Sequence, residues 1–327
     1  MVSKMKNLTN KKVLFITTKN LDYLRNTQEI EELQAVAAEV KVLGSYSKKY
    51  LVRVLTVYFG LLTTSLKAFD SVFVGFSPQL VLPIWFWKMR KNEVYIDFFI
   101  SMYDTFVCDR KKFTPNSIVA KVFRILDTFT LKKADHVIVD TKAHGDYFVD
   151  DFKVDADKIE VMYLKADTSI FYPREIEKRE DIQGKFDVLY FGSVLPLQGV
   201  EIVIEAARKL ADEKDIHFTI IGPIKDKMEK FESDTIEYID WLSQPDLATY
   251  IAMSDLCLAG HFNAEIGKAK RTIPGKAYIY EAVGKPMILG DNAATHELYL
   301  EDDKHYFVQM GNASALAEKI KEIKDRR

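Results

Sequence analysis

Residues 271–291, RTIPGKAYIYEAVGKPMILGD, are the stretch on which the expected fold depends most. They predict a helix, a tight turn and a buried strand in succession. Thr272 is a candidate N-cap, and Pro274 suits the first helical turn, where its missing N–H costs nothing. Gly284 is typical of a helix end, and the apolar run at 287–289 is typical of a short buried strand.

A group of cations precedes and enters this helix: Lys268, Lys270, Arg271 and Lys276. A helix N-terminus has free N–H groups and a partial positive charge, so it suits an anion. Four nearby cations indicate a diphosphate. The alternative is an ordinary helix–strand unit whose basic edge is merely solvated.

The composition is that of a globular protein with two domains. The chain has 327 residues, of which 48% are hydrophobic and 29% charged, and its formal net charge is −2. Because a polyanion binder normally carries a broad basic excess, no nucleic-acid partner is expected.

Several features indicate a protein of the reducing cytoplasm. Cys108 and Cys257 are far apart and lack metal-site spacing. The polar start MVSKMKNLTNKK does not resemble a signal peptide. The apolar run 50–66 is interrupted by Arg53 and Gly60 and falls short of a membrane span, so at most the chain lies on a membrane surface.

Short apolar segments alternate with helical ones along most of the chain, which predicts parallel sheets covered on both faces. The expected strands are 12–18, 40–43, 71–76, 93–97, 136–140 and 158–163, and then 187–191, 217–221, 236–238, 256–258 and 287–289. Such sheets bind ligands at the carboxyl ends of their strands.

The alternation breaks at a charged stretch containing Pro173 and REIEKREDIQGK. It predicts a first domain at 1–172, a linker at 173–186 and a second domain at 187–327. The expected fold is α/β, with two Rossmann-like parallel-sheet domains facing a cleft.

The first strand of the second domain ends in Gly192 and Ser193, before a turn and a helix. Glycine lets the backbone approach a ligand closely, and serine offers an N–H and a hydroxyl. This is not a G-x-G-x-x-G fingerprint, so a bound dinucleotide is disfavoured. A plain strand–turn–helix connection is the alternative.

Four segments follow one another in the order found in a known family: FGSVLPLQGVEIVIEAARKL, FTIIG, LATYIAMSDLCLAG and KAKRTIPGKAYIYEAVGKPMILGD. Over 188–320 they resemble the donor-binding half of GT-B glycosyltransferases, specifically retaining glycosyltransferase family 4. The likeness of the first half is weaker and rests on FDSVFVGF and YIDFFISMYD. The resemblance implies a nucleotide-sugar donor in the second domain, an acceptor on the first, and hexosyl transfer with retention, without a metal or another cofactor.

Carried over residue by residue, the resemblance places Gly192 against the donor phosphates. Two family cations are replaced here, by Ser193 and Gln198. A helix-start group, made up of Thr272 and the cations Lys268, Lys270, Arg271 and Lys276, is expected to hold the diphosphate instead.

The family's two acidic residues would fall on Arg271 and Ile279, and neither is acidic. Glu281 lies near the second position, which leaves its contact with the ribose open. Glu297 matches an acidic residue that can face the sugar, although a glutamate at a helix N-terminus is an equal alternative.

Two further donor-side candidates follow strands of the second domain. Trp241 matches a segment whose backbone meets the nucleobase, with core packing as the simpler alternative. His261 follows the strand at 256–258.

Polar residues after the strand 93–97 suit acceptor binding and acid–base chemistry. Asp97 and Asp104 are the catalytic candidates, accompanied by Ser101 and Tyr103. The alternative is that both carboxylates cap the loop and pair with Arg110.

Segments 47–54 and 80–91 mix aromatic, aliphatic and cationic residues, which suits a membrane interface. The alternative places Trp85 and Trp87 partly in the core.

The sequence thus favours a cytoplasmic, metal-independent glycosyltransferase that moves a sugar from a nucleotide-diphosphate sugar to a glycan, lipid-linked or protein acceptor. Because the acidic pair and two cations are missing, a non-catalytic glycosyltransferase-like subunit that binds an acceptor or a partner enzyme is the main alternative. A sugar-nucleotide epimerase or hydrolase on the same fold is a third.

Overall fold

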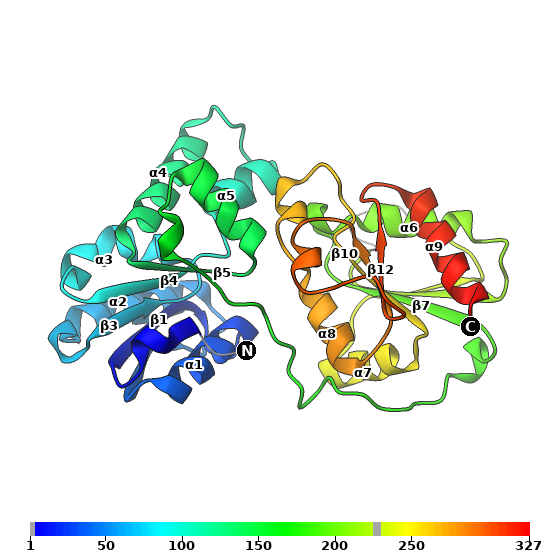
Figure 1. Ribbon diagram of the computed structural model, residues 1–327, viewed down its shortest axis with the longest axis horizontal. Helices are drawn as coiled ribbons and strands as arrows, with labels where there is room; N and C mark the ends of the chain where they lie inside the picture. The colour runs from blue at the N-terminus through cyan, green and yellow to red at the C-terminus, as the bar shows by residue number, and fades with distance from the viewer. Residues whose placement is uncertain (1–3, 225–229) are drawn as a thin grey trace. The chain divides into compact units, whose positions relative to one another are not determined.

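The computed structural model describes residues 4–224 and 230–327. The chain divides into two compact units, 1–164 and 165–327, each with its own sheet and core (Figure 1). Within the described ranges, no helix is both long enough and apolar enough to cross a membrane.

The first unit is built on a six-stranded parallel sheet in the order β2-β1-β3-β4-β5-β6. Side chains alternate between its two faces, as the pleat of a strand requires. Leu14 and Ile16 of β1 therefore enter one core, whereas Val13 and Phe15 enter the other. The strands are β1 (Lys12–Asn20), β2 (Glu39–Ser45), β3 (Ser71–Val74), β4 (Glu93–Asp97), β5 (His136–Val139) and β6 (Ile159–Val161).

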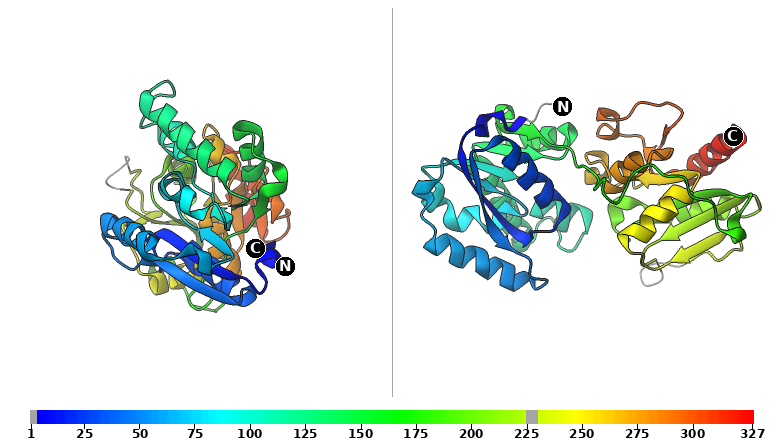
Figure 2. Two further views of the ribbon diagram at one scale, coloured as in Figure 1. Left: turned by 90° about the vertical axis from the view of Figure 1, so that its left-hand side faces the viewer. Right: turned by 90° about the horizontal axis from the view of Figure 1, so that it is seen from below.

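Helices cover both faces of this sheet unequally. The larger core lies under α2, α3, α4 and α5, and the smaller one under α1 and the short N-terminal turn at Lys4–Leu8 (Figure 2). The helices are α1 (Leu24–Val36), α2 (Tyr50–Thr63), α3 (Leu82–Met89), α4 (Ile118–Lys133) and α5 (Lys142–Phe152).

The second unit repeats this plan with a six-stranded parallel sheet in the order β12-β11-β10-β7-β8-β9. One core lies between this sheet and helices α6 and α9. The strands are β7 (Phe186–Phe191), β8 (Ile216–Ile221), β9 (Ile236–Ile239), β10 (Leu256–Gly260), β11 (Met287–Gly290) and β12 (His305–Val308); the helices are α6 (Val200–Lys209), α7 (Gln244–Met253), α8 (Gly275–Val283) and α9 (Ala313–Asp325).

The prediction of an α/β fold with two Rossmann-like parallel sheets is confirmed. Three local expectations differ from the structure. The polar stretch after β4 contains a π-helical turn, Asp104–Asp109, where a loop was expected. The strand β12 was not predicted, and the N-cap of α8 is Pro274 rather than Thr272.

Candidate functional site

Lys276, in the first turn of α8, is the centre of the candidate site. Its side chain is only 6% exposed and reaches the turn after β7. There its Nζ donates to Oε1 of Gln198 at 2.8 Å, and the same oxygen accepts from the Tyr190 hydroxyl at 2.6 Å. Three predicted donor-side residues, Gly192, Gln198 and Lys276, thus meet at the carboxyl end of β7.

The position of Gly192 shows how tightly this cluster is packed. Its φ is +156°, and a Cβ built there would lie 2.5 Å from Oε1 of Gln198 and 3.1 Å from Nζ of Lys276. Only glycine leaves the backbone open to the lysine ammonium at this point. A ligand that binds the backbone of Gly192 would therefore also meet Lys276.

The electrostatics of the cluster are set by burial. Burial lowers the pKa of Lys276 well below its ordinary value, because the charged form loses its hydration. The ammonium lies 3.7 Å from the centre of the Tyr190 ring, a cation–π contact that offsets part of this loss. An incoming polyanion would offset far more of it.

The loop after β10 completes the same edge of the sheet. His261, which is 5% exposed, precedes Phe262, whose N–H donates to the backbone oxygen of Gln198 at 3.2 Å. A Cβ on Gly290 would lie 2.0 Å from the His261 oxygen, so β11 also approaches this loop closely. His261 is therefore held beside the Gln198 turn, as a donor-side role requires.

The other cations of the helix-start group lie on a short 3₁₀ turn, Gly267–Lys270, and just after it. Lys268 and Arg271 are half-buried, and Lys270 is exposed. The Thr272 hydroxyl donates to the Lys268 oxygen at 2.9 Å and so fastens the end of this turn rather than capping α8. The 3₁₀ turn Pro196–Gln198, which carries Gln198, packs against this turn.

Three predicted donor-side residues lie in more open surroundings. Ser193 is exposed directly after Gly192, and Glu297 is half-buried in the 3₁₀ turn Thr295–Glu297 that follows β11. Trp241 is 77% exposed after β9, so the alternative of core packing is wrong.

Glu281 is not brought to the Lys276 cluster. Its carboxylate pairs with Nε2 of His305 at 2.7 Å, and His305 is the first residue of β12. The first residue of a parallel strand lies at the amino end of the sheet, whereas Gly192 lies past the carboxyl end of β7. The helix α8 thus presents Lys276 to the site and holds Glu281 away from it.

In the first unit, Asp97 ends β4 and lies in a buried ionic cluster. Arg25 of α1 binds both of its carboxylate oxygens, at 2.9 and 3.2 Å, and lies 3.4 Å from Glu29. Burial, followed by the charge of Asp97, raises the pKa of Glu29 well above its ordinary value. The partner of Asp97 is therefore Arg25, and the alternative pairing with Arg110 is wrong for this residue.

Asp104 is buried at the start of the π-helical turn, and its N–H donates to the Ser101 hydroxyl at 2.9 Å. Tyr103, just before it, donates its N–H to Asp127 at 2.8 Å. Arg110 at the other end of the turn lies over the ring of Phe106. The catalytic assignment of Asp97 and Asp104 stays a prediction.

Asp127 of α4 fixes this turn, and sequence reasoning missed it. Its carboxylate accepts hydrogen bonds from the Gln79 amide at 2.8 Å, the Ser101 hydroxyl at 2.7 Å, and the N–H groups of Met102 and Tyr103 at 3.1 and 2.8 Å. Burial raises the pKa of Asp127, against the lowering effect of these bonds. A lone aspartate on a largely apolar helix is the signal that could have indicated it.

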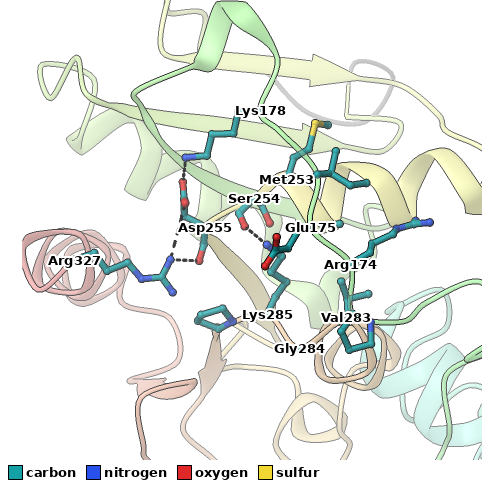
Figure 3. Close-up of a pocket in the computed structure, with 14 residues that line it drawn as sticks. Arg174, Glu175, Lys178, Met253, Ser254, Asp255, Val283, Gly284, Lys285 and Arg327 are labelled. Atoms are coloured by element: carbon teal, nitrogen blue, oxygen red, sulfur yellow. Dashed lines mark hydrogen bonds and ion pairs between the residues drawn. The ribbon is translucent and has the colours of Figure 1, made fainter.

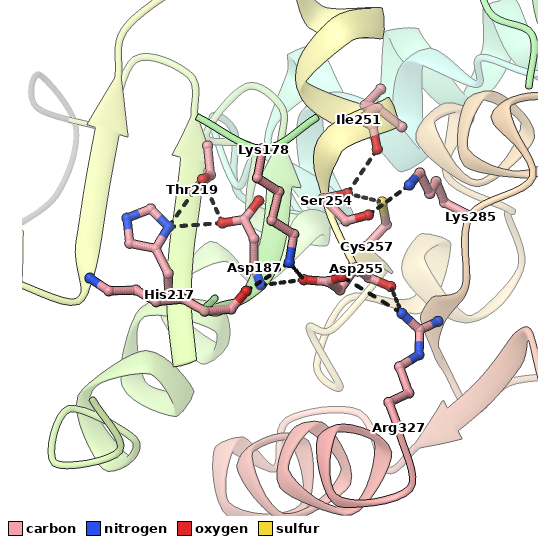
Figure 4. A network of polar contacts seen from close by, with 11 residues as sticks. Lys178, Asp187, His217, Thr219, Ile251, Ser254, Asp255, Cys257, Lys285 and Arg327 are labelled. Atoms are coloured by element: carbon pink, nitrogen blue, oxygen red, sulfur yellow. Dashed lines mark hydrogen bonds and ion pairs between the residues drawn. The ribbon is translucent and has the colours of Figure 1, made fainter. Parts of the chain in front are cut away.

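An open pocket of about 770 Å³ lies at the amino end of the second unit's strands, away from Gly192 (Figure 3). Asp255, just before β10, accepts from the N–H of Asp187 at 2.8 Å and pairs with Lys178. Arg327 donates to the Asp255 backbone oxygen at 2.9 Å (Figure 4). These bonds tie the segment before β7, the sheet and the end of the described chain together, which is a structural role.

Comparisons with known proteins agree with this geometry. Residues 185–325 match the family model of the "Glycosyl transferases group 1". An uncharacterized 41.2 kDa protein of the cps region of Klebsiella pneumoniae is 23% identical over 193 residues, which are 58% of this chain and 51% of that protein. A D-inositol 3-phosphate glycosyltransferase of Paenarthrobacter aurescens is 25% identical over 150 residues, 41% of this chain and 37% of that protein. The chain thus matches about half or less of the length of these two relatives.

Solved structures share the fold of the whole chain. The complex of Anabaena Alr3699/HepE with UDP has a TM-score of 0.64 at 14% identity and covers 97% of this chain and 91% of its own. Sucrose-phosphate synthase of Thermosynechococcus elongatus has a TM-score of 0.66 at 13% identity and covers 96% and 90%. The chain therefore has the GT-B fold, and residues 185–325 are similar to the glycosyl transferases group 1.

Proposed function

We propose that this protein transfers a hexosyl unit from a nucleotide-diphosphate sugar to a glycan, lipid-linked or protein acceptor, with retention of configuration and without a metal ion. The observation that carries the proposal is the meeting of Gly192, Gln198 and Lys276 at the carboxyl end of β7, with Nζ of Lys276 2.8 Å from Oε1 of Gln198. Parallel α/β sheets bind their ligands at this edge.

The chemistry follows from the surroundings of Lys276. Gln198 stands where the resemblance to family 4 implies a lysine, and the Lys276 ammonium reaches the same place from α8. A bound diphosphate would replace its lost hydration and raise its pKa back toward the ordinary value. The N-terminus of α8 and Lys276 would then stabilise the negative charge that develops on the leaving diphosphate, the part that a metal ion plays elsewhere.

The acceptor side is proposed to lie on the first unit, around the turn that Asp127 holds. Asp104 begins this turn, and Asp97 ends the strand before it. Because Arg25 binds both oxygens of Asp97, that carboxylate is held in one orientation. The exposed thiol of Cys108 supports a cytoplasmic location.

A calorimetric titration tests the donor site. Purified protein is titrated with a panel of nucleoside diphosphates and with the matching nucleosides. Lys276→Ala should weaken binding of the preferred diphosphate by about 10- to 100-fold, because one charge-assisted contact is lost. Nucleoside binding should change little.

Lys304→Ala is the matched control, since Lys304 is exposed next to β12 at the amino end of the sheet. It should leave both affinities unchanged. Equal losses of diphosphate and nucleoside affinity in Lys276→Ala would mean that the phosphate site is misplaced.

A non-catalytic subunit is the second candidate, favoured by the engagement of Glu281 with His305. Such a subunit would bind a nucleotide sugar or an acceptor without turnover. A screen of nucleotide sugars with and without added acceptors distinguishes the cases: transfer supports the enzyme, donor breakdown without acceptor supports a hydrolase or epimerase, and binding without either supports the subunit.

A further inference from the structure

The outer side of α2 is apolar although the helix lies at the surface. Its inner side places Val57 and Leu61 in the core, both fully buried. On the outer side Leu51, Leu55, Phe59 and Leu62 follow one another at helical spacing, and all are more than half exposed. A helix that is apolar on all sides is normally buried on all sides. The outer side of α2 is instead exposed in this structure.

The apolar surface continues onto α3. Tyr58 packs edge-on against Trp85 with ring centres 5.8 Å apart, and Nζ of Lys88 donates to the Leu62 oxygen at 3.2 Å, so the two helices lie side by side. Trp85 is in the core, as the alternative interpretation expected, whereas Trp87 is 64% exposed. The α2–α3 face is defined here by its exposed residues Leu51, Leu55, Phe59, Leu62, Ile84 and Trp87.

The charges around this face have one sign. Residues 46–69 and 77–92 hold seven Lys and Arg side chains and no Asp or Glu, in a chain that has 48 acidic residues. Five of these cations are exposed, and among the described residues none of the five forms an ion pair: Lys48, Lys49, Lys67, Arg90 and Lys91. The cations lie before α2, after it and after α3, so they flank the apolar side chains.

Of the surfaces that could cover this face, an anionic one fits its charge. A second copy of the chain docked face to face would bring like cations together without a carboxylate to pair them. A bilayer with anionic headgroups instead accepts apolar side chains below the headgroups and cations among them. We propose that the α2–α3 face is a docking surface for an anionic membrane.

This proposal goes beyond sugar transfer and does not depend on it. The face lies wholly within the first unit, whereas the Lys276 cluster lies in the second. Membrane docking would place the unit that is proposed to bind the acceptor at a lipid surface. A vesicle that contains no acceptor is therefore a sufficient probe.

Flotation of the full chain with vesicles tests the proposal. The protein should float with vesicles of phosphatidylcholine and phosphatidylglycerol but not with phosphatidylcholine alone, and rising salt should release it. The double variant Phe59→Ser, Leu62→Ser should float less. Its membrane partition constant should fall at least about tenfold, because two apolar side chains that would insert into the bilayer are lost. Leu300→Ser, which removes a 77% exposed leucine of the second unit, should have no effect.

Trp87 provides a second measurement that needs no change in the face. In a Trp241→Phe background, the exposed indole that remains is Trp87, since Trp85 is buried. Its emission should shift to the blue when anionic vesicles are added, and acrylamide should quench it less.

Three results would overturn the proposal. The wild-type chain could fail to float with anionic vesicles at low salt, or the Leu300→Ser control could lose as much binding as the double variant. The third is a wild-type oligomer in sedimentation that the double variant breaks into monomers without any vesicle binding, which would assign the face to a protein partner.

Discussion

Lys276 combines a cost in folding with a proposed role in binding. Its pKa is lowered by burial, so between that lowered value and its ordinary value the unfolded chain holds more protons than the folded one. The stability contribution of this residue therefore rises with pH through that window and is least favourable below it. A buried lysine with a lowered pKa is typical of an anion-binding site.

Lys276→Met should stabilise the ligand-free protein at neutral pH. The thioether side chain has a similar length and no charge to desolvate, so we expect a gain of about 1–2 kcal/mol in the free energy of unfolding. Thermal unfolding at several pH values measures it, and the gain should shrink as the pH rises toward the ordinary value of lysine. A loss of stability at all pH values would show that the ammonium is well paired in the free protein.

Gly192 and Gly290 should respond differently to an added methyl group. At Gly192 the new Cβ would meet the ends of the Gln198 and Lys276 side chains, which can move aside. At Gly290 it would lie 2.0 Å from the backbone oxygen of His261, which cannot move without shifting the loop.

Gly192→Ala carries a backbone cost at φ +156° but should keep its fold, and it should lose diphosphate affinity, about tenfold or more. Gly290→Ala should lose about 1–3 kcal/mol of stability through overpacking. Urea unfolding and calorimetric titration of both variants separate the two effects. A Gly192→Ala protein that binds diphosphate normally would contradict the placement of the site.

At the scale of elements, the sequence was most informative where a strand is a short apolar run between turn residues. Runs such as those of β1 and β7 could be predicted because parallel strands are buried on both faces. The strand β12, HYFV, is four residues long, and the charged residues 301–304 directly before it weaken its apolar signal. Its place is decided by pairing with β11.

In the candidate site, too, some residues could be predicted from the sequence and some contacts could not. Gly192, Gln198 and Lys276 could be named from the sequence because each lies at the end of a predicted element. The partners of the acidic residues could not, because Asp97–Arg25 and Asp127–Gln79 join residues from different elements. Which side chain a buried carboxylate meets depends on helix packing rather than on local pattern.

The conformation of the whole turn after β4 should depend on Asp127. Asp127→Ala would leave the Gln79 amide, the Ser101 hydroxyl and two N–H groups without their acceptor, at a cost of about 2–4 kcal/mol. Hydrogen exchange should speed up at residues 102–104 more than elsewhere in the first unit. Asp150→Ala, an exposed aspartate on α5, is the control and should change neither property.

At the scale of the whole molecule, each unit has its own parallel sheet and its own cores, which are the conditions for folding alone. The cluster around Lys276 draws all of its residues from the second unit: Tyr190, Gly192, Gln198 and His261 lie there as well. The proposed acceptor side and the α2–α3 face draw theirs from the first. Donor binding should therefore be separable from sugar transfer.

The fragment 165–327, expressed alone, should unfold cooperatively and bind the preferred nucleoside diphosphate within a factor of about three of the full chain, a difference of about 0.7 kcal/mol. It should transfer no sugar, because the acceptor side is proposed to lie on the other unit. Denaturation, calorimetry and a transfer assay on the fragment and the full chain check the three expectations. A folded fragment that binds no diphosphate would mean that residues of the first unit take part in the donor site, and the assignment of that site to the second unit alone would then fall.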